Sequence, residues 1–60
     1  MPNLTQVEIN SIREVVAAHQ TTAAKLNNYA GLCQDAEVKQ MFRQAATEAA
    51  KSASNLIQML

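Results

Sequence analysis

The sequence predicts an all-α protein, with residues 1–60 forming one domain that folds as an antiparallel two-helix hairpin. Two observations predict this fold class. The chain is 48% hydrophobic and contains one glycine and one proline, a composition that favours helices over a disordered chain. Apolar residues also recur three and four positions apart in two long stretches, which is the spacing of one face of a helix.

The first helix is expected over about residues 6–33. Thr5 and Glu8 match a capping box, in which each side chain accepts a hydrogen bond from the backbone amide of the other residue. An earlier end at Gly31 is the alternative, because glycine often caps the C-terminus of a helix. A stripe of small and apolar residues, with one histidine among them, runs along the helix: Ile9, Ile12, Val16, His19, Ala23, Leu26, Ala30 and Cys33.

The second helix is expected over about residues 36–59, after a tight turn at about residues 34–36. Asp35 is suited to cap its N-terminus. If the turn is centred there, two residues lie opposite each other when their numbers sum to about 71. Tyr29 would then stack on Phe42, and His19 would face Ser52. The stripe of this helix is expected at Val38, Phe42, Ala45, Ala49, Ser52, Leu56 and Met59.

Each helix carries more apolar surface than one neighbouring helix can cover. Two helices also cannot enclose a core on all sides, so we expect two copies of the hairpin to form a homodimeric four-helix bundle. The core and the dimer contact are predicted at Ile12, Val16, His19, Leu26, Tyr29, Phe42, Ala45, Ala49 and Leu56. The stripes are widened by Val15, Ala18, Thr22, Tyr29 and Leu32 in the first helix and by Met41, Ala46, Ala50, Ala53, Ile57 and Leu60 in the second.

The residue pattern argues against catalysis. His19 is a weak candidate metal ligand, because a metal needs three or four donors and a dimer would supply two imidazoles. It is otherwise a core or boundary residue, bonded to Ser52, Thr22 or the partner chain. Cys33 is interpreted as a small buried hydrophobic residue. No enzyme activity, catalytic residue or cofactor is therefore predicted.

Charge and hydropathy limit the partners and the location. Five basic and five acidic residues are spread singly along the chain, so neither a nucleic acid nor a membrane surface is an expected partner. No apolar run approaches the ~20 residues of a membrane span, and the first residues lack the pattern of a signal peptide. An intracellular location is expected.

A family resemblance is carried by Tyr29-Ala30, by the turn Asp35-Ala36-Glu37-Val38-Lys39 and by the later Phe42, Ala46 and Leu56. Over about residues 14–60 this arrangement resembles half of a ferritin-like bundle of the rubrerythrin type. It resembles more closely the ferritin-like hairpins of the spore coat protein F family of endospore-forming bacteria. The resemblance implies a ferritin-like bundle and a structural role in the spore coat.

The same resemblance argues against iron chemistry here. His19 stands where the ferritin-like pattern has a metal-binding glutamate, and Ala49 and Ser52 stand where it has a glutamate and a histidine. Ala36 replaces the usual turn proline. The expected function is thus a non-enzymatic structural or interaction protein, a homodimer with other coat proteins as further partners. The alternatives are a metal or small-ligand binder that uses His19 inside the dimer, and an adaptor that receives a helix of another protein.

Overall fold

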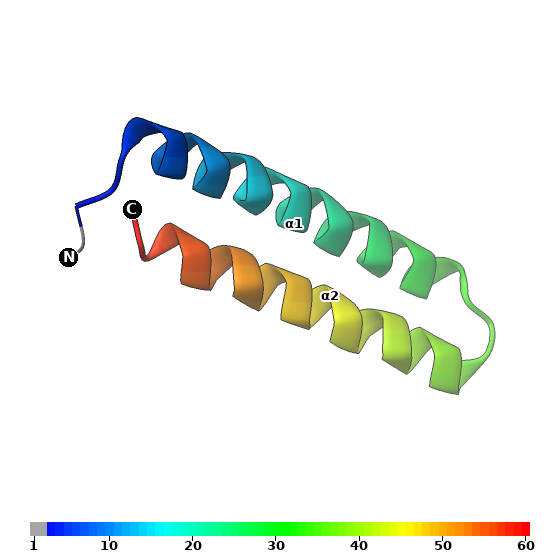
Figure 1. Ribbon diagram of the computed structural model, residues 1–60. Helices are drawn as coiled ribbons and strands as arrows, with labels where there is room; N and C mark the ends of the chain where they lie inside the picture. The colour runs from blue at the N-terminus through cyan, green and yellow to red at the C-terminus, as the bar shows by residue number, and fades with distance from the viewer. Residues whose placement is uncertain (1–2) are drawn as a thin grey trace.

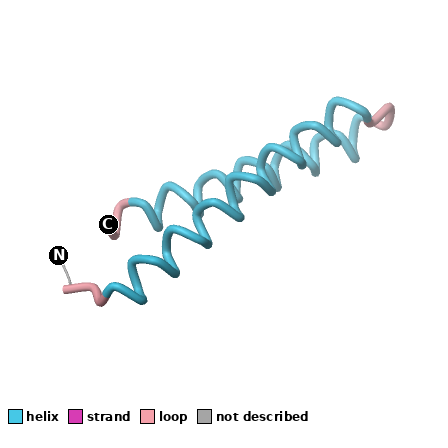
Figure 2. The backbone as a smooth tube through the Cα atoms, turned by 90° about the horizontal axis from the view of Figure 1, so that it is seen from above, coloured by secondary structure: helices cyan, strands magenta, loops and turns pink. Residues whose placement is uncertain are grey.

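The computed structural model describes residues 3–60 as a helical hairpin. Helix α1 comprises Gln6–Leu32 and helix α2 comprises Ala36–Ile57. The helices run antiparallel, so the start of α1 and the end of α2 lie at one end of the hairpin and the connection lies at the other (Figure 1). They cross at a shallow angle (Figure 2) in a molecule of 47 × 16 × 9 Å. These helices confirm the predicted all-α hairpin.

The N-terminus of α1 has the expected capping geometry. The Glu8 amide donates to Thr5 Oγ1 at 3.1 Å, and the Thr5 amide donates to Glu8 Oε1 at 2.9 Å. These bonds satisfy two amides that the helix itself leaves without partners. Two hydrogen bonds lower the pKa of Glu8 below its ordinary 4.5. The larger effect comes from the bond with the Thr5 backbone, and the smaller from the bond with the Thr5 side chain.

This lowered pKa predicts an acid-sensitive start of α1. Because folding favours the charged carboxylate, its contribution to stability is complete above pH 4.5 and is lost as the pH falls through the lower folded value. We expect the NMR titration midpoint of Glu8 to lie below 4.5. The Glu8→Gln variant should lack this part of the acid dependence. A midpoint at or above the ordinary value would contradict the capping box.

The turn consists of residues 33–35, and a hydrogen bond stabilises it at the end of each helix. The Cys33 amide donates to the Tyr29 carbonyl at 3.1 Å, after which the backbone becomes extended. Asp35 caps α2, because its Oδ1 accepts from the Val38 amide at 2.9 Å. Helix α1 passes through Gly31 without a left-handed residue, so Gly31 is not a C-cap. Beyond Ile57, residues 58–60 form a turn in place of the last predicted residues of the helix.

The contact between the helices is built mostly from alanine. Every residue of the predicted α1 stripe is buried or half-buried, and of these Val16, Ala23 and Ala30 are buried. On α2 the buried residues are Ala46 and Ala53. Small side chains at the contact allow two helix axes to approach towards the ~8 Å end of the usual range.

The predicted stripe of α2 was wrong in part: Phe42, Ala45, Ala49 and Leu56 are half-buried as expected, but the other three positions are not. Val38, Ser52 and Met59 are exposed, whereas the line that faces α1 is shifted by about one residue. The physical reason is that the small side chains of Ala46 and Ala53 fit against α1, which turns Val38 and Met41 away from it while Phe42 and Leu56 stay on the contact line. The contact line of α2 is Lys39, Phe42, Ala46, Ala49, Ala53 and Leu56.

Neither helix within residues 3–60 combines the length and the apolar character that a membrane crossing requires.

Candidate functional site

The two long sides of the hairpin differ in chemistry. On one side, which we call the apolar side, helical spacing brings together mostly uncharged residues that flank the contact line of each helix. The exposed fraction is 42% for Val15, 49% for Tyr29 and 65% for Met41. The apolar side comprises Val15, Ala18, Thr22 and Tyr29 of α1 and Val38, Met41, Ala45 and Ser52 of α2, and the same spacing adds the exposed Lys25 and Glu48.

A groove runs between the helices on the apolar side, near the turn. Its volume is about 350 Å³, and five apolar residues line it: Leu26, Val38, Met41, Phe42 and Ala45. No charged residue is among them. A groove of this composition is suited to an apolar side chain from another molecule and offers no polar group to orient a small substrate.

Tyr29, predicted among the residues of the core and the dimer contact, is not buried within the hairpin and lies beside this groove. Its ring centroid is 5.9 Å from that of Phe42, and the two planes are tilted by 53°. The pair therefore meets across the hairpin at the expected level, but tilted and not stacked. Half of Tyr29 remains exposed because no other element of residues 3–60 covers this side. Phe42 is half-buried beneath it.

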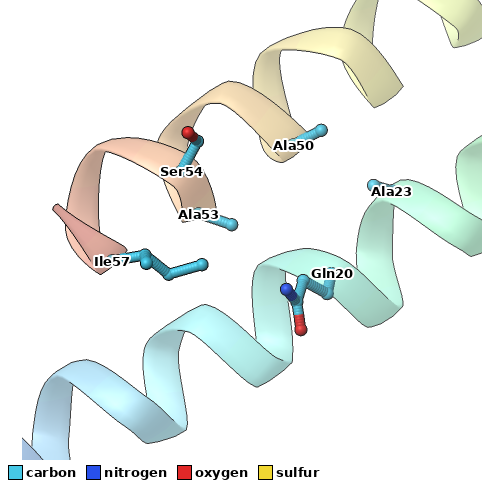
Figure 3. A pocket seen from close by; sticks show the side chains of 6 residues that line it. All are labelled: Gln20, Ala23, Ala50, Ala53, Ser54 and Ile57. Carbon is cyan, nitrogen blue, oxygen red and sulfur yellow. The ribbon is translucent and has the colours of Figure 1, made fainter.

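The opposite side of the hairpin, which we call the polar side, carries amide, hydroxyl and guanidinium groups. Figure 3 shows its groove, which is lined by Gln20 of α1 and by Ala50, Ser54 and Ile57 of α2. Its floor is formed by Ala23 and Ala53, and its volume is about 350 Å³. Helical spacing places the following residues on this side: Arg13, Gln20, Ala24 and Asn27 of α1 and Arg43, Thr47, Ala50 and Ser54 of α2.

A third hollow, of about 430 Å³, lies on the outer face of α2 alone. It is lined by Arg43, Glu48 and Lys51 with three uncharged polar residues. Charges of both signs on a single exposed helix are typical of a solvated surface and do not converge on one point.

His19 is half-buried on the contact line of α1, and its hydrogen bond is local. Its Nδ1 lies 2.9 Å from the carbonyl oxygen of Val15 in the same helix. Since a carbonyl oxygen only accepts, Nδ1 carries the proton in this bond. The expected pairing with Ser52 is wrong, because Ser52 is exposed and turned towards the apolar side. The Val15 carbonyl was not among the partners considered for His19.

The other chemically reactive groups do not gather into a site. Cys33 is half-buried at the end of α1 and is a free thiol. Within residues 3–60, no group of three or more histidine, cysteine, aspartate or glutamate residues is placed to hold a metal ion. Of the predicted core and dimer residues, Val16 is buried and Tyr29 is exposed. The remaining ones are half-buried: Ile12, His19, Leu26, Phe42, Ala45, Ala49 and Leu56.

Comparison of the chain with protein-family models, with curated proteins and with solved structures found no match.

Proposed function

We propose that this chain is a non-enzymatic structural or interaction protein that works as a homodimer, with two hairpins forming a four-helix bundle. The observation that carries the proposal is the surface that the hairpin leaves exposed. A folded monomer of 6.5 kDa usually exposes about 3,800 Å². This hairpin exposes 4595 Å². The excess of about 800 Å² equals what one partner buries in an interface of standard size.

The composition of the core supports the same proposal. Four of the five buried residues are alanines, and no large side chain among the described residues is fully buried. Alanine supplies little apolar area, whereas chains of this size usually need many buried large residues, a disulfide, a metal or a partner to fold. The larger apolar residues Tyr29, Val38 and Met41 are available for such a partner, because each is more than 40% exposed.

We further propose a structural role in the spore coat. This part rests on the resemblance of Tyr29, of the turn at Asp35 and of Phe42 to the hairpins of the spore coat protein F family. A helical bundle that offers binding surfaces and has no catalytic activity suits a structural role of this kind. Other coat proteins would then bind the outer faces of the dimer.

Thermal unfolding tests whether folding and dimerisation are coupled. When the folded state contains two chains, mass action makes the melting temperature rise with protein concentration. We expect circular dichroism to show such a rise over a hundredfold range of concentration. A melting temperature that stays constant over that range would contradict the homodimer. A folded monomer would instead favour the adaptor, whose apolar groove receives a helix of a different protein.

A further inference from the structure

We infer that the two copies meet through the apolar side of each hairpin, and that the polar side faces solvent in the dimer. This inference rests on the proposed function and adds the surface that carries it. The apolar side holds the groove near the turn, formed by Leu26, Val38, Met41, Phe42 and Ala45. It also holds the exposed ring of Tyr29 and the exposed methyl groups of Val15.

Charge decides between the two sides. A twofold interface buries the same patch of both chains, so each charge in the patch is buried in both copies and needs an opposite charge within the same patch. The polar side contains Arg13 and Arg43 and no acidic residue among those that define it, so pairing it would take these charges out of water without a partner. The groove of the apolar side is lined by no charged residue and can be buried without that penalty, while Lys25 and Glu48 share the helical spacing of that side beyond the groove.

Size and shape favour a second hairpin over a single foreign helix as the occupant. The apolar side draws on both helices, from Val15 and Ser52 near the open end to Tyr29 and Val38 near the turn. One added helix would cover the groove but leave the outer flank of at least one helix exposed. A second two-helix face matches this surface in width. A second hairpin is also large enough to bury the roughly 800 Å² by which the surface of this hairpin exceeds that of a folded monomer of its mass.

The test uses two alanines of α2 that lie on opposite sides. Ala45 is on the apolar side, and Ala50 lines the polar groove shown in Figure 3. We expect Ala45→Glu to raise the dissociation constant of the dimer at least ~100-fold, because each dimer would bury two unpaired carboxylates. The matched control Ala50→Glu should change it by less than ~3-fold, as surface substitutions do. On α1, Ala18→Glu and Ala24→Glu form the corresponding pair. Sedimentation equilibrium measures all four variants against the wild type.

A measurement on the unmodified chain keeps the test independent of how the variants fold. In a mixed sample of labelled and unlabelled chains, isotope-filtered NMR should detect contacts between chains at the Met41 methyl group and none at Ala50. Contacts at Ala50 without contacts at Met41, or dissociation by Ala50→Glu alone, would overturn the inference while leaving the homodimer intact. A wild-type chain that is a folded monomer would instead overturn the proposed function as well.

Discussion

Replacing Phe42 by alanine is expected to lower the free energy of unfolding by about 3 kcal/mol or more. The ring lies on the contact line of α2 and lines the apolar groove, and its centroid is 5.9 Å from that of the Tyr29 ring. Its removal deletes apolar contacts and leaves a cavity that alanines nearby are too small to fill. In the proposed dimer the second copy covers this groove, so the loss includes contacts between chains. Chemical denaturation at one fixed protein concentration measures the change.

Leu32→Ala is the matched control for Phe42→Ala. Leu32 is a large apolar residue at the same end of the hairpin, but 74% of it is exposed. Its truncation should change the free energy of unfolding by less than ~0.5 kcal/mol. Equal effects of the two substitutions would mean that the Phe42 ring does not pack between the helices.

Ala30→Leu is expected to have the second-largest effect, a destabilisation of about 1–3 kcal/mol. Ala30 has 0% of its surface exposed, so a leucine there adds three carbon atoms at a fully buried position of the contact between the helices. The added volume forces either the helix axes apart or the side chain out of its preferred rotamer.

Ala24→Leu provides the control for this substitution on the same helix. Ala24 is exposed, and leucine is nearly as good a helix former as alanine, so stability should stay within ~0.5 kcal/mol of the wild type. Both variants can be compared by thermal unfolding at equal concentration. A neutral Ala30→Leu would contradict the alanine-based contact between α1 and α2.

The features that depend on neighbouring residues could be read from the sequence. The caps at Thr5 and Asp35 are formed by side chains that reach an amide three positions along the chain, so the local pattern is sufficient to indicate them. The α1 stripe was also readable, because one run of apolar residues at Ile9, Ile12 and Val16 stands out clearly from its polar surroundings.

The rotation of α2 could not be read in the same way. Alanines at positions 45, 46, 49, 50 and 53 make several faces of this helix almost equally apolar. What selects Ala46 and Ala53 is the close fit to α1, which is a property of the pair of helices and not of either stretch.

The candidate surface was only partly foreseen for the same reason. Tyr29 and Ala45 were expected to form core, Met41 was expected to widen a stripe, and their common side emerges once the helices are packed. The bond of His19 to the Val15 carbonyl was not foreseen, because a histidine in a helix can reach several polar groups. Its sequence position does not select among them.

Sedimentation equilibrium of the wild-type chain tests the central claim most directly. The homodimer predicts a mass of twice the 6.5 kDa of one chain at micromolar concentration, with dissociation to unfolded chains on dilution. A folded species with the mass of one chain across the whole concentration range would contradict it.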